Sequence, residues 1–169
     1  MKILAKVNFI DLKDRFWIDL SPLEKMPHLQ ELSLYNMPIN NIDALAKLTH
    51  LKQLIIIQTQ VTSLEPLRNL TNLEKLHTVY IPVADCEPIK GLVNLNELYL
   101  DATEITNIKP LNGLKNLIIL SLSNTSISDL EPLYGLAKLR RISLRNCKNI
   151  IDGQVEYLQK ALPNLEIIR

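Results

Sequence analysis

The sequence predicts an elongated α/β domain, a solenoid in which similar structural units stack side by side along one axis. Three observations lead to this prediction: a repeat of 22 residues, an alternating apolar pattern typical of a strand, and turn-forming residues at fixed repeat positions. We expect a single domain over residues 1–169, with repeats that start near residues 7, 29, 51, 73, 95, 117 and 139. Each repeat would contribute one strand, which gives seven parallel strands in one sheet.

The repeat is seen most clearly in columns of apolar residues that stand 22 positions apart. The first column contains Leu29, Leu51, Leu73, Leu95, Leu117 and Leu139. The columns three and five positions later are also apolar, except at Thr78. An apolar residue at every second position indicates a short strand with one buried face. Because a single repeat cannot cover its own apolar edge, we expect the repeats to stack and to share one continuous core.

The segment that returns from one strand to the next has its own spacing. Its apolar residues recur every third position, which favours 3₁₀ or extended turns, because 22 residues leave little room for an α-helix. Proline presets the backbone φ angle, and it shares one return position as Pro22, Pro66, Pro88, Pro110 and Pro132. A tight turn is expected at the shared position of Gly91, Gly113 and Gly135. Turn geometry just before the strand is expected at Asn72, Asn94 and Asn116.

The last repeat is longer than the others, because 26 positions separate Leu139 from the corresponding Leu165. Within it, Val155, Leu158 and Leu162 have helical spacing. Asp152 precedes them and is a candidate N-cap residue. We therefore expect an α-helix in the last repeat, where it closes the C-terminal end of the solenoid.

The pattern LxxLxLxxTxIxxLxPLxxLxxL resembles the leucine-rich-repeat family in its 22-residue class, which includes bacterial internalins and a phosphatase-1 regulatory subunit. Thr59, Thr103 and Thr125 match the threonine that this class places after the strand, whereas Met37 and Ile81 depart from it. The resemblance implies a right-handed solenoid, with the parallel sheet on its concave face and the 3₁₀ or extended turns on its convex face.

The composition argues against several classes of function. The formal net charge is +1, so global electrostatics does not favour a nucleic-acid partner. The sequence has no apolar run long enough to span a membrane, so no membrane partner is expected. Its N-terminus lacks the apolar stretch and the cleavage site of a signal peptide.

Two cysteines bear on the cellular location. Cys147 takes the place of the buried cysteine in longer, cysteine-containing leucine-rich repeats, which the last repeat resembles. Cys86 and Cys147 lie three repeats apart, about 14 Å at roughly 4.8 Å per strand, which is too far for a disulfide. Free buried thiols and the missing export signal favour a cytoplasmic protein.

Side chains that alternate with the core leucines of each strand should face the concave surface. They form an apolar and aromatic centre with polar surroundings, a composition typical of protein-binding surfaces. The candidate partner-binding residues are Phe9, Tyr35, Ile55, Ile57, His77, Val79, Tyr80, Tyr99, Asp101, Ile119, Arg141 and Arg145. The alternative explanation is that Ile, Val and Tyr simply favour strands. The late arginines would orient an acidic partner, unless they only keep the surface soluble.

We expect a monomer, with one alternative. Met1, Leu4 and Val7 continue the three-residue spacing of a return segment, so the first repeat begins without an evident cap. This open end also carries aromatic side chains, and it would allow dimerisation or contact with another domain. The aromatic side chains are those of Phe9, Phe16 and Trp17.

Catalysis has little support in the sequence. His77 lies near Ser121 and Ser123 on the predicted sheet, but an open sheet offers no pocket for an oxyanion. His28 and His50 share a repeat position, yet a metal site would need a third ligand. We therefore predict no enzyme, no catalytic residues, no metal and no cofactor.

The predicted function is that of a non-enzymatic protein-interaction module that binds a protein partner through its concave face. Two alternatives follow from the resemblance. One is a ligand-binding domain of a larger secreted or surface internalin-like protein, and the other is a phosphatase regulatory subunit.

Overall fold

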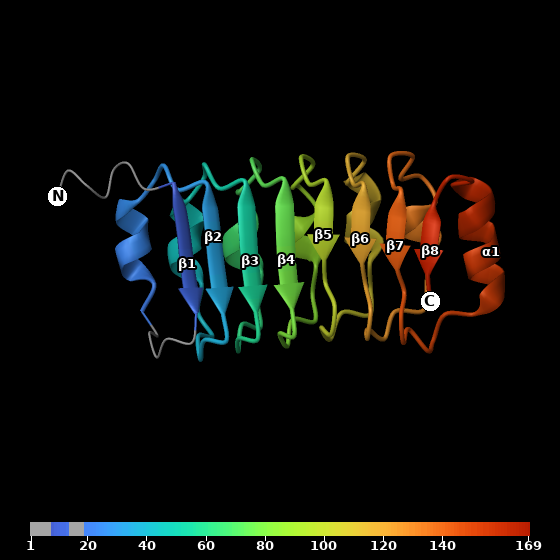
Figure 1. The fold of residues 1–169 in the computed structure, drawn as a ribbon, viewed down its shortest axis with the longest axis horizontal. Coiled ribbons are helices and arrows are strands. Elements are labelled where there is room, and N and C mark those ends of the chain that lie inside the picture. Colours follow the sequence, from blue (N-terminus) through green and yellow to red (C-terminus); the bar gives the residue numbers. More distant parts are fainter. Residues whose placement is uncertain (1–7, 14–18) are drawn as a thin grey trace.

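Each strand pairs only with the strands that precede and follow it in the sequence, and every pairing is parallel (Figure 1). The computed structural model describes residues 8–13 and 19–169, and these contain eight strands. The strands are β1 (Phe9–Lys13), β2 (Glu31–Tyr35), β3 (Gln53–Ile57), β4 (Lys75–Val79), β5 (Glu97–Tyr99), β6 (Ile119–Ser121), β7 (Arg141–Ser143) and β8 (Glu166–Ile168). Seven of them lie in the seven predicted repeats. The sequence analysis did not predict β8, because three residues near the end of the chain carry too little periodicity.

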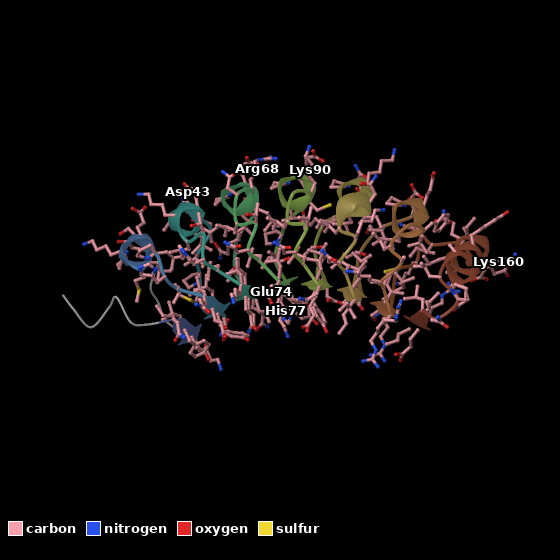
Figure 2. The ribbon with its side chains drawn as sticks, turned by 90° about the horizontal axis from the view of Figure 1, so that it is seen from above. Asp43, Arg68, Glu74, His77, Lys90 and Lys160 are labelled. Carbon is pink, nitrogen blue, oxygen red and sulfur yellow. The ribbon has the colours of Figure 1, made fainter. Side chains whose placement is uncertain are left out.

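The return segments lie behind the sheet as short helices. Those within the described residues are the 3₁₀ helices η2 (Ser21–Lys25), η3 (Asp43–Lys47), η4 (Glu65–Leu67), η5 (Glu87–Ile89), η6 (Lys109–Gly113) and η7 (Glu131–Leu133). Figure 2 shows the strands on the inside of an arc and the helices on its outside. The sheet therefore forms the concave face and the 3₁₀ helices form the convex face, as predicted. One strand with its return segment is called a rung below.

The core lies between the sheet and the helices and runs along the whole arc. Leu54 and Leu98 on the strands and Leu111 on a return segment have no exposed surface. Thr78, which interrupts its apolar column, is fully buried as well. Its hydroxyl donates a hydrogen bond to the Tyr99 carbonyl oxygen at 3.4 Å, so the buried polar group is satisfied.

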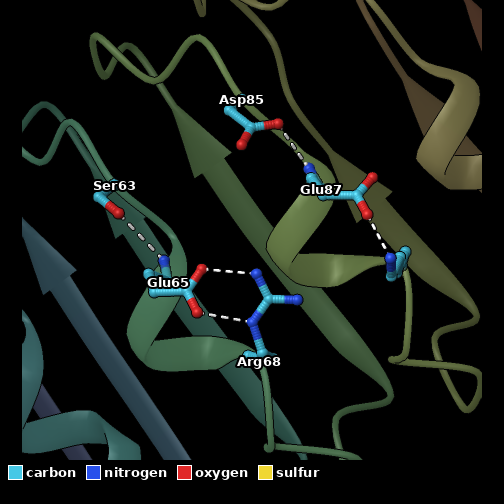
Figure 3. Close-up of polar contacts among 6 residues, drawn as sticks. Ser63, Glu65, Arg68, Asp85 and Glu87 are labelled. Atoms are coloured by element: carbon cyan, nitrogen blue, oxygen red, sulfur yellow. Dashed lines mark hydrogen bonds and ion pairs between the residues drawn. The ribbon is translucent and has the colours of Figure 1, made fainter.

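A polar side chain that the sequence analysis did not single out precedes each 3₁₀ helix. Its oxygen accepts a hydrogen bond from the backbone N–H two residues later, over 2.7 to 3.2 Å. These side chains share one repeat position, as Asp19, Asn41, Ser63, Asp85, Asn107 and Asp129. Figure 3 shows two of the bonds, from Glu65 to Ser63 and from Glu87 to Asp85. Each bond satisfies a backbone donor at the start of a helix, so this column fixes where the turns begin.

The glycines and asparagines of the return segments lie in turns, as predicted. None of the four glycines has a positive φ angle, so these turns do not require glycine, and Lys47 occupies the repeat position of Gly91. Asn72, Asn94 and Asn116 also connect neighbouring rungs. Each side-chain amide donates to a backbone carbonyl oxygen of the preceding rung, at 2.8 to 2.9 Å.

Left-handed backbone occurs at a different repeat position, just beyond the strand. The six residues there have φ angles between 49° and 58°, and they are Asn36, Gln58, Tyr80, Ala102, Asn124 and Asn146. The N–H group at this position donates to the next rung, for example from Gln58 to the Val79 carbonyl oxygen at 3.1 Å. The left-handed residue therefore turns the chain out of the sheet while it keeps the pairing between rungs.

The last rung contains the predicted α-helix, α1 (Asp152–Ala161). Leu158 and Leu162 are buried, as their spacing predicts. The predicted N-cap is wrong, because Ile151 holds that position and Asp152 is the first helical residue. The Asp152 carboxylate accepts a hydrogen bond from Arg169 at 2.5 Å instead, which ties the helix to the end of the chain.

Both cysteines are free and buried. The Cys147 thiol donates to the Leu122 carbonyl oxygen at 3.0 Å. Burial raises the pKa of the Cys86 thiol to about 12, so this group stays protonated at neutral pH and is a poor nucleophile.

The predicted open end is described only in part. Phe9 begins β1, and its side chain is about half exposed. The other residues of that prediction lie outside the described residues, namely Met1, Leu4, Val7, Phe16 and Trp17.

We predict that Leu100→Ala lowers the free energy of unfolding by about 2–5 kcal/mol, because Leu100 has no exposed surface and its truncation leaves a cavity. Urea denaturation followed by circular dichroism measures this loss. The control is Val93→Ala, since Val93 is 49% exposed and should change stability by less than about 1 kcal/mol. Equal losses in the two variants would contradict the assignment of Leu100 to the core.

A second prediction concerns the polar column before the 3₁₀ helices. Asp85→Ala should lower the free energy of unfolding by about 0.5–2 kcal/mol, because the Glu87 N–H loses its acceptor. The same denaturation experiment checks it, with Glu104→Ala as the exposed control. If Asp85→Ala unfolds no more easily than the control, these bonds do not stabilise the turns.

Candidate protein-interaction face

Three rows of side chains run along the concave face, and each row takes one residue from every rung. The predicted residues Phe9, Ile119 and Arg141 lie in the first row, and Ile55, His77 and Tyr99 lie in the middle row. Tyr35, Ile57, Val79, Asp101 and Arg145 lie at the repeat position of the third row. Tyr80 belongs to no row, because it stands in the loop that follows β4.

The pairing register brings the apolar members of these rows together on β2 to β5. Ile57 lies between Tyr35 and Val79 in the third row. The middle row continues from β3 through β4 to β5 beside it. The resulting surface is called the central patch, and it consists of Tyr35, Ile55, Ile57, His77, Val79 and Tyr99.

The middle row is more enclosed than its position on a surface suggests. Ile55 is only 9% exposed, and Ser33 and Ser121 are 5% and 7% exposed. Strands in a sheet lie about 4.8 Å apart, and a concave sheet brings the side chains of neighbouring strands closer still. Ile55 therefore offers less surface than the half-buried Ile57 and Val79 of the third row.

His77 occupies the middle of the central patch. Its ring packs against the Tyr99 ring, with 4.3 Å between the centroids. Its Nε2 atom is buried and has no hydrogen-bond partner among the described residues. The Glu97 carboxylate is 3.8 Å from Nε2 and is bound to Lys75 at 2.7 Å. Burial lowers the pKa of His77, and the nearby Glu97 carboxylate opposes this shift only in part.

A network of hydroxyl groups lies beside the central patch on β6 and β7. The Asp101 carboxylate accepts hydrogen bonds from the Ser121 hydroxyl and from the Ser123 backbone N–H, the latter at 3.0 Å. The Ser123 and Ser143 hydroxyl oxygens are 2.8 Å apart. These bonds restrain the side chains of Ser121, Ser123 and Ser143 and give their hydroxyls partners other than a histidine.

The histidine is separated from the serines on the sheet. The register places Tyr99 of β5 between His77 of β4 and Ser121 of β6. The group beside the Ser121 hydroxyl is therefore the Asp101 carboxylate and not the imidazole of His77, so a histidine–serine pair does not form.

Basic side chains lie at both ends of the concave face. Near β1 the Lys13 ammonium lies over the Tyr35 ring, 5.1 Å from its centroid. Near β7 Arg141 pairs with Glu166 of β8 at 2.8 Å. Arg145 is exposed, and it forms no ion pair within residues 8–13 and 19–169.

His28 and His50 are neighbours, as their shared repeat position predicts, with ring centroids 5.5 Å apart. The described part of the chain contains no group of three side chains suited to hold a metal ion. None of its helices is both long enough and apolar enough to cross a membrane.

Solved structures with the same architecture include two internalins of Listeria monocytogenes. Internalin C2 is 31% identical to this chain and superposes with a TM-score of 0.91, over 98% of this chain and 71% of its own. The internalin inlF is 23% identical, with a TM-score of 0.66, over 85% of this chain and about half (49%) of its own, a likeness that shows a shared fold. A scan against protein-family models found no match, and a search of curated proteins found none either.

The lowered pKa of His77 leads to a prediction on pH. The ordinary histidine pKa is 6.5, so as pH falls the unfolded chain takes up this proton before the folded chain does. The free energy of unfolding therefore carries the full contribution of neutral His77 above pH 6.5. This contribution declines as pH falls from 6.5 toward the lowered pKa of the folded state. Urea denaturation at about pH 7.5 and about pH 5.5, above the range of most carboxylates, measures the decline.

His77→Phe should reduce this decline, because the ring remains but cannot take up a proton. His50→Phe is the control, since it makes the same replacement at an exposed histidine outside the central patch. An equal decline in the wild-type protein and in His77→Phe would contradict the prediction.

Proposed function

Because the chain belongs to the internalin family of leucine-rich-repeat proteins, we propose that it is a non-enzymatic protein-interaction module whose concave face binds a protein partner. One observation carries this proposal. In β1 to β4 the last strand residue belongs to the third row, and it is Lys13 in β1 but Ile57 in β3 and Val79 in β4. The fold therefore does not require apolar side chains in this row.

Strand propensity alone gives a weaker account of the same residues. It would favour Ile, Val or Tyr wherever this row lies in a strand, yet β1 ends with Lys13 in the same register as Tyr35, Ile57 and Val79. A patch of apolar and aromatic side chains surrounded by polar ones is typical of protein-binding surfaces. The clustering therefore supports selection for a partner.

The size of the face limits the partner. Eight strands at about 4.8 Å and a width of roughly 16 Å give a projected area on the order of 500 Å². A standard interface buries about 800 Å² on each side. The face suits a helix, a loop or a small domain, and a larger partner would also contact the loops beyond the strands.

A second candidate function is that of a recognition domain within a larger protein. The chain of internalin C2 extends beyond the part that this chain matches, which favours this candidate. The proposed location is the cytoplasm, because the free buried thiols suit a reducing compartment. Fractionation of the producing cells tests the location, and recovery of the protein from the medium or the cell surface would favour the second candidate.

We predict that Ile57→Arg abolishes partner binding and leaves the fold intact, because Ile57 is half-buried on the face and not in the core. Affinity purification from native lysate, with quantitative mass spectrometry, compares the two proteins. Ile118→Arg is the matched control, since Ile118 is 43% exposed and lies outside the three rows. Circular dichroism checks that both variants remain folded.

A protein captured by the wild type and by Ile118→Arg, but not by Ile57→Arg, would identify the partner. Identical captures by all three proteins would contradict a binding site on the concave face.

A further inference from the structure

Tyr80 is an outlier at its repeat position. Its φ angle is 54°, in the left-handed region that bulky residues rarely adopt. Asn36, Asn124 and Asn146 occupy the same position, and asparagine is among the residues that tolerate this conformation best. The Tyr80 residue is 59% exposed, and within the described part of the chain its side chain forms no hydrogen bond or ring contact. No hydrogen bond or ring contact within the described residues therefore accounts for a tyrosine here.

The position of Tyr80 suits an anchor for a partner. It directly follows Val79 of the central patch, and its N–H donates to the Asp101 carbonyl oxygen at 3.0 Å. The backbone is thus held by the neighbouring rung, while the ring stands free at the edge where the strands end. Tyrosine combines a large apolar surface with a polar hydroxyl, and it is enriched among the residues that dominate binding energies.

The charges of the concave face indicate what the partner carries. Lys75 is paired with Glu97 at 2.7 Å, and Arg141 is paired with Glu166 at 2.8 Å. Arg145 is exposed and has no carboxylate partner in residues 8–13 and 19–169. It lies three rungs beyond β4 in the third row, about 14 Å at roughly 4.8 Å per strand. A partner carboxylate would complete an ion pair there.

Acidic side chains of the concave face limit where a carboxylate of the partner can lie. Glu31 is exposed on β2, where it would repel a carboxylate. Asp101, between Tyr80 and Arg145, already accepts bonds from Ser121 and Ser123, so it offers a partner a negative charge and few free acceptor sites. An acidic group is therefore favoured over β7 and disfavoured beside Glu31 and Asp101.

We propose that Tyr80 anchors an acidic protein segment on the concave face, with a carboxylate of that segment bound to Arg145. This inference rests on the proposed protein-binding function and names the chemistry of the partner. It also implies that stability and binding are opposed at Tyr80, because the residue best suited to the backbone there is not a tyrosine.

The test uses the full chain and a displayed library of random peptides of about 16 residues, long enough as a helix to cross five rungs. Peptides are selected on the wild-type protein, and their dissociation constants are then measured on five variants, one of which is Ile57→Arg. Tyr80→Asn is the principal variant and Gln58→Asn is its control, because Gln58 has the same left-handed backbone on the preceding rung. Arg145→Gln tests the ion pair. Its control is Arg68→Gln, since Arg68 lies on the convex side and is bound to Glu65 there (Figures 2 and 3).

We expect Tyr80→Asn to raise the urea midpoint and to weaken peptide binding about tenfold or more. Gln58→Asn should also raise the midpoint but leave binding unchanged. Arg145→Gln should weaken binding and reduce its dependence on salt, whereas Arg68→Gln should do neither. The selected peptides should be richer in Asp and Glu than the unselected library.

Peptides that bind Tyr80→Asn as tightly as the wild type, or a selection that yields no Tyr80-dependent binder, would overturn the proposal. Ile57→Arg separates this failure from a failure of the proposed function. If Ile57→Arg loses the peptides and Tyr80→Asn keeps them, the concave face binds but Tyr80 is not its anchor. If both variants keep them, the concave site itself is wrong.

Discussion

The leucines of each rung are buried only because another rung lies beside them. No rung has enough apolar surface to form a core alone, so stability depends on the contact between neighbours along one axis. This constraint explains why Leu54, Leu76 and Leu98 occur in strict register. It also explains the bonds that join rungs outside the sheet, such as those from Asn72 and Asn94 to the preceding return segments. Each rung repeats the same few contacts, and the remaining positions are free to vary.

The freedom to vary is unequal across the concave face. Neighbouring side chains cover most of the surface of the middle row. Ile55 and Ser121 are therefore nearly buried, although they lie outside the core between the sheet and the helices. The side chains of the third row and of the loop beyond it are generally more exposed. From β2 onward the third row holds the aromatic Tyr35, the aliphatic Ile57 and Val79, and the charged Asp101 and Arg145. Recognition in such a fold is therefore a matter of which side chain stands on which rung. The proposed roles of Tyr80 and Arg145 are examples of this, because neither residue contributes to the contacts between side chains that hold the rungs together.

Much of the fold could be predicted from the sequence, because burial of leucine imposes the same demand on every rung. The features that were missed depend on hydrogen bonds that several residue types can make. Asp85, Asn107 and Ser63 all start a 3₁₀ helix in the same way, so no single letter marks that column. The left-handed position was missed as well, because residues of several types occupy it. The glycines were misleading, because none of them has a positive φ angle. The rows of the candidate site followed from alternation along the strands, but the enclosure of Ile55 did not, since it depends on the curvature of the sheet.

The central claim is that residues for stability and residues for recognition are separate within each rung. A scan of all single substitutions, with folding stability measured by protease resistance of the displayed protein, tests it most directly. The account predicts that polar replacements are tolerated at Ile57 and Val79 and are strongly destabilising at Leu54 and Leu76, which lie on the same two strands. If polar replacements destabilise all four positions alike, the third row belongs to the core and the proposed binding face has no basis.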